Sequence, residues 1–118
     1  MGINIVHLVG RAGRDTEIKF LDSGSQVANV SMAVNRIGRN APPDWFNLEM
    51  WDKTAQIAAD WVKKGSLIGV EGSLKFETWD DRNNPGITRS RPVIRVTRLY
   101  LLGSKRDIDP SAVSDYDG

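Results

Sequence analysis

The sequence has no cysteine and only one histidine, His7. Without cysteine there are no disulfides, cysteine zinc sites or thiol nucleophiles, and 118 residues bury enough surface to fold without such crosslinks. A single histidine cannot build a multi-histidine metal site, and it leaves little material for a hydrolytic triad. These absences favour a small single domain without catalytic activity, metal or other cofactor.

Long apolar runs are also missing, since the longest is the stretch of four residues at 99–102. A helix that crosses a bilayer needs about 20 apolar residues. The N-terminus has no positively charged region ahead of its first apolar stretch, so the sequence predicts no secretory signal. We therefore expect a cytoplasmic protein with no membrane partner.

Net charge is small, at +1, but the charges are unevenly distributed. Residues 1–103 carry 14 lysines and arginines against 11 acidic residues, whereas residues 104–118 carry 2 against 4. The body is mildly basic and the C-terminal stretch is acidic. Because the apolar periodicity stops after Gly103, we expect one folded domain over residues 1–103 and a disordered, mildly acidic tail over residues 104–118.

The apolar pattern predicts an all-β domain with one helix. Strands are expected at residues 3–9, 16–21, 26–34, 45–51, 66–79 and 87–102. The glycine-containing stretch at 10–13 is expected to end the first strand. A helix is expected over 53–62, capped by Asp52 or Thr54 and ended by the segment 63–65. This order, with one extra short hairpin near the front, is typical of the five-stranded Greek-key barrel known as the OB-fold.

Three of the four tryptophans fall on the polar side of this alternation. In 45–51 the even-numbered residues are apolar, which places Trp45 and Trp51 on the polar face. In 66–79 the even-numbered residues, including Leu74 and Phe76, form the apolar face, and Trp79 lies opposite them. Taken singly, each indole can cover a barrel end, a loop or a subunit interface. Taken together, they favour a platform on which unpaired bases stack.

Positively charged residues lie between and beside these tryptophans in the sequence. They occupy the loop before Trp45, both ends of the predicted helix, the strand that carries Trp79 and the hairpin after it. The candidates are Arg36, Arg39, Lys53, Lys64, Lys75, Arg82, Arg89 and Arg91. One such residue alone is usually a solvated surface charge. Together they favour a groove that follows a phosphate backbone while the indoles hold bases, which binds a single strand without reading its sequence.

Residues 1 to about 103 resemble the bacterial single-stranded DNA-binding protein family. The stretches that carry the likeness are VHLVGR at 6–11, QVAN at 26–29, DWFN at 44–47, WDKTA at 51–55, KKGSLIGVEG at 63–72 and KFETWDD at 75–81. The run LGSKRD at 102–107 is similar to the cyanobacterial branch of that family.

The resemblance implies an OB-fold homotetramer in which the first strands of neighbouring subunits pair. It implies that single-stranded DNA wraps around this assembly during replication, recombination and repair, and that the protein is associated with the nucleoid. The family's stacking positions correspond to Trp45, Trp51 and Trp79, and its phosphate contacts correspond to Lys53, Lys64 and Lys75.

The sequence departs from the family pattern in three places. Residues 35–43 contain no aromatic residue where the family carries a further stacking position, and Phe46 stands where a histidine often touches the subunit interface. The chain ends at Gly118 without the usual acidic tip, which closes in Pro-Phe and docks replication and repair proteins. Either the sequence is shortened or partner recruitment through the tail is altered.

Other candidate signals have simpler structural interpretations. Asp80 and Asp81 are typical of a turn, His7 is expected to be hydrogen-bonded or at an interface, and Trp61 is expected to pack or to fill an interface because it follows Ile57 by four helical positions. Two rival functions stay open. One is an OB module whose indoles are buried by protein partners, as in a primosome component. The other is a small metal-dependent nuclease, which the scarcity of histidine and clustered acidic residues disfavours.

Overall fold

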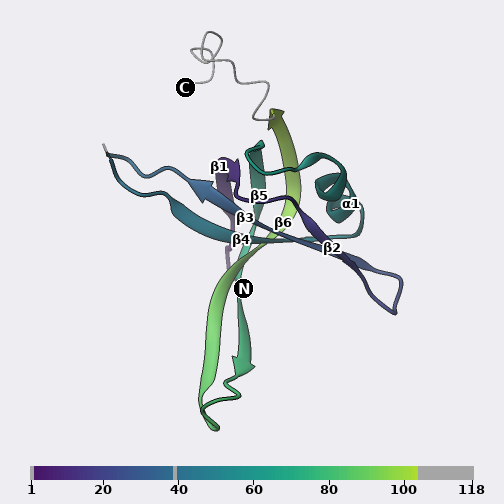
Figure 1. The fold of residues 1–118 in the computed structure, drawn as a ribbon, viewed down its shortest axis with the longest axis vertical. Helices are drawn as coiled ribbons and strands as arrows, with labels where there is room; N and C mark the ends of the chain where they lie inside the picture. Colours follow the sequence, from purple (N-terminus) through teal and green to yellow (C-terminus); the bar gives the residue numbers. More distant parts are fainter. Residues whose placement is uncertain (1, 39, 104–118) are drawn as a thin grey trace.

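The computed structural model describes residues 2–38 and 40–103, over which it contains six strands and one helix (Figure 1). Their bounds are β1 Val6–Ala12, β2 Glu17–Phe20, β3 Gln26–Val34, β4 Asp44–Trp51, α1 Asp52–Trp61, β5 Leu67–Asp80 and β6 Thr88–Gly103. The predicted types and order of the elements are confirmed. The tail expected over 104–118 lies outside the described residues. Over the part that is described, no helix has the length and apolarity needed to cross a membrane.

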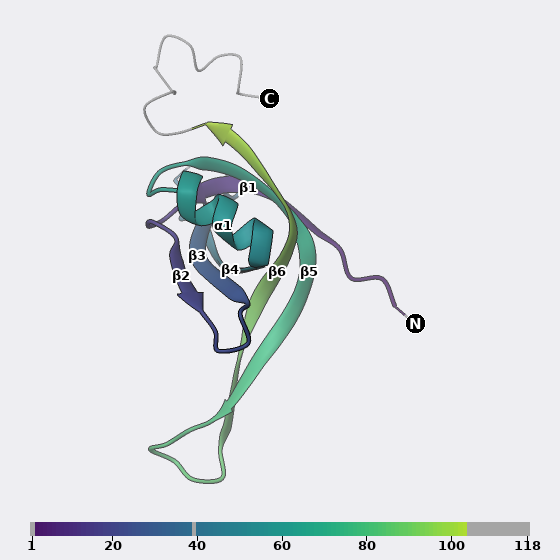
Figure 2. The same ribbon diagram turned by 90° about the vertical axis from the view of Figure 1, so that its right-hand side faces the viewer.

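Five of the strands close into a ring. The sheet runs in the order β1–β5–β6–β4–β3–β2, and β1 also pairs with β3. The ring therefore consists of β1, β5, β6, β4 and β3, while β2 pairs with the first half of β3. The helix α1 packs against β3, β4 and β6 and lies over the ring in Figure 2. This closed five-strand arrangement is the OB-fold that the sequence predicts.

The barrel interior is filled by the even-numbered residues of β3, β4 and the first part of β5, as the period-2 alternation predicts. The buried side chains are Ala28, Val30, Met32, Leu48, Met50, Ile68 and Val70. The helix adds Ala55 and Ala58, and Val62 follows directly after it. Fully burying an aliphatic side chain of this size contributes about 1.5 to 3 kcal/mol, so this cluster holds the barrel closed.

The β5–β6 hairpin projects beyond the barrel (Figure 1). The register joins Leu74 to Ile94 and Phe76 to Pro92. Leu74 and Phe76 keep the phase that the sequence predicts, but their exposed fractions are 37% and 63%. They are not buried because β6 pairs with β4 only at Ile94 and Arg95, so the outer hairpin has no second layer to cover it. Pro92 lies in this two-stranded part, as its lack of an N–H group predicts.

The prediction that the first strand ends at Val9, before the stretch 10–13, is wrong. The strand continues to Ala12, because Arg11 and Ala12 pair with β3 and close the ring. A Cβ atom at Gly10 would overlap the backbone carbonyl of Ala33, so the glycine permits a close approach between two strands. In the sequence alone, a glycine that ends a strand and a glycine that lets two strands approach look the same.

The expected side-chain cap of the helix is also wrong. The N-cap residue is Trp51, and it makes no side-chain cap hydrogen bond. Asp52 adopts a left-handed backbone with φ of 49°, and its Oδ1 instead accepts a hydrogen bond from the Gln26 backbone N–H at 3.1 Å. At the other end, Lys63 Nζ donates to the Ala59 carbonyl at 3.2 Å, so one predicted cation does meet the helix C-terminus.

Candidate nucleic-acid interface

Trp45 lies on the outer side of the barrel wall with much of its ring accessible. It pairs with Ala33 of β3 and is 60% exposed. A Cβ atom at Gly13 would come within 2.5 Å of the indole, so the glycine allows the ring to rest against the end of β1. The indole is therefore supported from below and open to solvent.

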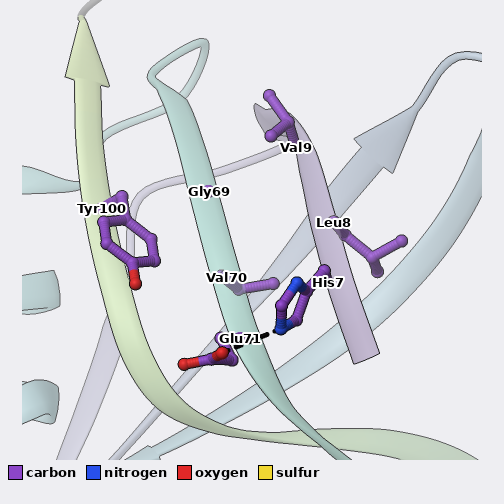
Figure 3. Close-up of a pocket in the computed structure, with 7 residues that line it drawn as sticks. All are labelled: His7, Leu8, Val9, Gly69, Val70, Glu71 and Tyr100. Carbon is purple, nitrogen blue, oxygen red and sulfur yellow. Dashed lines mark ion pairs between the residues drawn. The ribbon is translucent and has the colours of Figure 1, made fainter. Parts of the chain in front are cut away.

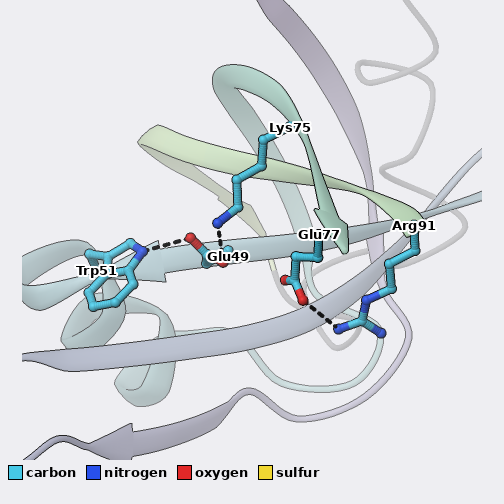
Figure 4. A network of polar contacts seen from close by, with 5 residues as sticks. All are labelled: Glu49, Trp51, Lys75, Glu77 and Arg91. Atoms are coloured by element: carbon cyan, nitrogen blue, oxygen red, sulfur yellow. Dashed lines mark hydrogen bonds and ion pairs between the residues drawn. The ribbon is translucent and has the colours of Figure 1, made fainter. Parts of the chain in front are cut away.

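Trp51 lies on the same side of β4 and is half-buried. Its indole Nε1 donates a hydrogen bond to Glu49 Oε1 at 2.7 Å (Figure 4). The Arg95 guanidinium, on β6, lies over the ring with its carbon 5.8 Å from the ring centre, within the range of a cation–π interaction. The ring is therefore held at its edge and on one face.

Lys75 reaches the same place from β5. Its Nζ forms an ion pair with Glu49 Oε2 at 2.9 Å, while 39% of the lysine side chain stays exposed (Figure 4). Burial is the largest influence on Glu49 and by itself raises the pKa of its carboxyl group. The hydrogen bonds from Lys75 and Trp51, with the charges of Lys75 and Arg95, outweigh it and hold the pKa below its ordinary value of 4.5.

Trp79 extends the aromatic series into the outer hairpin. It pairs with Arg89 and is 47% exposed. The indole borders an open hollow of about 350 Å³, which Glu77, Thr78 and Arg91 also line. Arg91 Nη2 faces Glu77 Oε2 at 3.5 Å, further out along the hairpin than Lys75 (Figure 4). By strand register, Trp79 shares the side of the sheet that carries Lys75 and Arg95.

The remaining candidate cations differ in how far acidic neighbours neutralise them. Arg36 pairs with Asp44 at 2.8 Å. Arg89 pairs with Asp81 at 2.9 Å. Among the residues that the structure describes, three candidates form no ion pair, namely Lys53, Lys64 and Arg82. Arg39 lies outside the described residues.

Lys53 and Lys64 flank the helix, at its second residue and three residues beyond its end. The Lys64 backbone N–H donates to Asp15 Oδ1 at 2.8 Å, in the segment that follows Gly13. This contact ties Lys64 to the loop against which Trp45 rests. The tertiary structure thus brings the C-terminal side of α1 near the loop that supports Trp45, while its N-terminal end follows Trp51 directly along the chain.

Sequence reasoning missed Glu49 and Arg95. The alternation places Glu49 on the polar face but gives no sign that its neighbours cover it. Only 6% of the residue is exposed. Arg95 keeps the odd-numbered phase of Arg89 and Arg91, with Val93 between them, and this signal was available in the sequence. The expectation that Trp61 packs against its own chain is wrong, since 67% of the residue is exposed.

Asp81 behaves as the turn residue that the sequence predicts. Its carboxylate accepts hydrogen bonds from the Asn83 backbone at 2.9 Å, from the Asn84 side chain at 3.3 Å and from Arg89 at 2.9 Å. The Asn83 backbone bond, followed by Arg89 and Asn84, lowers the pKa of Asp81 below its ordinary value of 3.8. Its carboxylate is thus occupied in shaping the hairpin turn.

A second surface lies on the outside of β1, β5 and β6 (Figure 3). His7 Nε2 lies 2.8 Å from Glu71 Oε1, so a carboxylate faces the imidazole. A hollow of about 240 Å³ is lined by these two residues together with Val9, Gly69 and Tyr100. Val9 is 57% exposed and Tyr100 is 48% exposed. This apolar surface is separate from the tryptophan series.

The tryptophan side combines ring faces with cations. Aromatic rings hold a base through its π face, whichever base it is, and neighbouring cations attract the backbone of the same strand. Over residues 2–38 and 40–103, no group of three or more His, Cys, Asp or Glu side chains is placed to hold a metal ion. The arrangement suits reversible binding of an unpaired polyanion.

Comparison with known proteins gives consistent matches over nearly the whole chain. The model of the single-strand binding protein family matches residues 3–102. A single-stranded DNA-binding protein of Thermosynechococcus vestitus is 57% identical over 113 residues, covering 96% of this chain and 93% of that protein. Single-stranded DNA-binding protein 1 of Synechocystis sp. is 58% identical over 118 residues, covering 98% of this chain and 97% of that protein. Single-stranded DNA-binding protein 1 of Nostoc sp. is 60% identical over 109 residues, covering 92% of this chain and 91% of that protein.

Proposed function

Because the chain belongs to the single-strand binding protein family, we propose that it binds single-stranded DNA with little sequence preference and protects it in replication, recombination and repair. Bases stack on Trp45, Trp51 and Trp79, and the surrounding cations attract the phosphates. Proteins of this family are not enzymes, and the same holds for this chain. Such a role places the protein in the cytoplasm, at the nucleoid.

The observation that carries the proposal is the accessibility of the indoles. Trp45 and Trp79 are 60% and 47% exposed, and Trp51 is half-buried, on the same side of the sheet as Lys75. An exposed tryptophan is costly to leave in water unless it meets a partner. A duplex hides its base faces in the stack and does not supply that partner, whereas a single strand does.

The cations are proposed to contribute unequally. Lys53, Lys64 and Arg82 are available to phosphates at once. Arg36, Lys75, Arg89 and Arg91 each have a carboxylate neighbour with which a phosphate has to compete. Each phosphate that is neutralised adds about 0.7 to the steepness of the log–log dependence of affinity on salt for a single strand.

The proposal is tested by titrating the intrinsic tryptophan fluorescence with oligo-dT and with a duplex of matched length, at two salt concentrations. We expect strong quenching by oligo-dT, much weaker binding of the duplex, and a site of roughly 4 to 16 nucleotides for each fold. Emission that oligo-dT leaves unchanged would contradict the proposal and favour a protein-binding OB module. Degradation of the oligonucleotide on addition of a divalent metal would favour a nuclease.

We also propose that the protein forms a homotetramer in which β1 pairs with β1 of another subunit. On one edge, residues 6–11 of β1 pair with β5. On the other edge, within the described residues, only Arg11 and Ala12 pair with a strand, β3. An open edge is a template for another strand. The exposed apolar side chains of Ile5, just before β1, and of Val9, within it, support the proposal. Replication and repair proteins are proposed as partners through residues 104–118.

A further inference from the structure

Glu49 touches both kinds of group that the proposed DNA site uses. One carboxylate oxygen accepts the hydrogen bond from the Trp51 indole at 2.7 Å, and the other pairs with the Lys75 ammonium at 2.9 Å (Figure 4). Glu49 is 6% exposed, whereas Trp51 is half-buried and 39% of the Lys75 side chain is accessible. The carboxylate therefore lies beneath the ring and the cation, which face the solvent.

A carboxylate is an unexpected group on a surface that receives phosphates, since like charges repel. Its burial and its two partners resolve the conflict, because the lysine charge compensates it and the indole occupies its second oxygen. The indole has one N–H donor, so this bond fixes the edge of the ring. Arg95, 5.8 Å from the ring centre, holds the ring from one face.

We propose that Glu49 is a positioning residue of the DNA-binding surface, which orients the Trp51 indole for stacking and holds the Lys75 ammonium beside it. The inference rests on the proposed binding of single-stranded DNA. Because both partners are already ordered in the free protein, little side-chain freedom is lost on binding. The Lys75 charge is also committed to Glu49, so it adds little to the salt dependence of the unmodified protein.

Two substitutions separate the two contacts. Glu49→Gln keeps an oxygen that accepts the indole N–H but has no charge for Lys75, and Glu49→Leu keeps neither contact. At about 1 M salt the Debye length falls to about 3 Å, so oligo-dT affinity then mainly reports stacking. There we expect Glu49→Leu to bind about five- to tenfold more weakly and Glu49→Gln to stay within about twofold of the unmodified protein.

A double-mutant cycle shows whether the loss passes through the indole. Phenylalanine stacks but has no N–H, so in a Trp51→Phe background we expect Glu49→Leu to change the affinity by less than about twofold. Equal losses in both backgrounds would overturn the Trp51 part of the inference. So would a Glu49→Gln loss as large as that of Glu49→Leu. If the leucine variant does not fold, Glu49→Asp takes its place in the cycle, since the shorter carboxylate withdraws from the indole.

The proposed hold of Glu49 on Lys75 is tested by the salt dependence of oligo-dT affinity. Glu49→Gln frees the lysine for a phosphate, and we expect the log–log slope to steepen by about 0.7. Asp60→Asn removes the same charge from α1, where Asp60 accepts a hydrogen bond from Gln56, and serves as the matched control with an unchanged slope. A Glu49→Gln slope equal to that of the control would overturn this part. Absence of oligo-dT binding by the unmodified protein would instead contradict the proposed function itself.

Discussion

Trp45, Trp51 and Trp79 share one side of the sheet but differ in what supports each ring. Trp45 rests on Gly13, Trp51 is held by Glu49 and Arg95, and Trp79 stands on the outer hairpin. The sequence predicted the side on which each indole lies, because alternation along a strand is a local property. The supports come from residues distant in the sequence, which no local pattern reveals.

Replacement of Trp79 tests the stacking role of a single ring. We expect Trp79→Ala to weaken oligo-dT binding by about 1 to 3 kcal/mol, the range for one stacked base, with little effect on unfolding because the ring is 47% exposed. Fluorescence or anisotropy titration measures the loss. Trp61→Ala is the control, because Trp61 is on the helix, 67% exposed and outside the proposed site. Equal losses for the two variants would argue against a specific role of Trp79.

The buried carboxylate predicts how stability changes with pH. The pKa of Glu49 is lower in the folded protein than its ordinary value of 4.5. Its contacts therefore stabilise the fold fully above about pH 4.5, and this contribution is lost as the pH falls through the folded pKa. We expect urea unfolding to show that the free energy of unfolding decreases less over this acid range for Glu49→Gln than for the unmodified protein. Asp60→Asn serves as the control, and a decrease as small in Asp60→Asn would contradict the assignment.

At the scale of elements, the closure of the barrel depends on β1. The strand pairs with β5 along most of its length and reaches β3 only at Arg11 and Ala12. The type of each element and its approximate bounds could be predicted from the sequence, because alternation and turn residues are local signals. The passage of β1 through Gly10 could not be predicted, because it depends on where Ala33 lies in space.

Gly10→Ala is predicted to destabilise the fold, because the added methyl group would overlap the Ala33 carbonyl, which the backbone holds in place. We expect a loss of about 1 to 3 kcal/mol in the free energy of unfolding, measured with urea. Gly69→Ala is a matched change in a neighbouring strand, where the new Cβ would meet Tyr100 at an ordinary 3.5 Å. The barrel argument fails if the two variants unfold at the same urea concentration.

At the scale of the whole molecule, the exposed surfaces divide into two groups. The three indoles, Lys75 and Arg95 lie on one side of β4 and the hairpin, and an apolar surface lies around β1 and Tyr100 (Figure 3). The proposed tetramer assigns the second surface to contacts between subunits and leaves the first to DNA. This division predicts that assembly and single-site binding are altered by different substitutions.

Val9→Lys is predicted to weaken assembly, since it places a charge at the open edge of β1 on a side chain that is 57% exposed. We expect size-exclusion chromatography with light scattering to show smaller species than for the unmodified protein. Ile37→Lys, at a fully exposed loop position, makes the same chemical change and should leave the mass unaltered. A tetramer that survives Val9→Lys would contradict pairing through this edge, and a monomeric unmodified protein would contradict the tetramer.

The sequence by itself determined the order of the strands and the single helix along the chain, the apolar interior and the outward phase of three tryptophans, because each of these follows from spacing along the chain. The tertiary structure decided which groups support those rings and which cations are already neutralised. Glu49, Lys75 and Arg95 come from three different strands and meet only when β4, β6 and β5 lie side by side. The exposure of Phe76 was likewise decided by the tertiary structure, because none of the described residues forms a layer over that part of the hairpin.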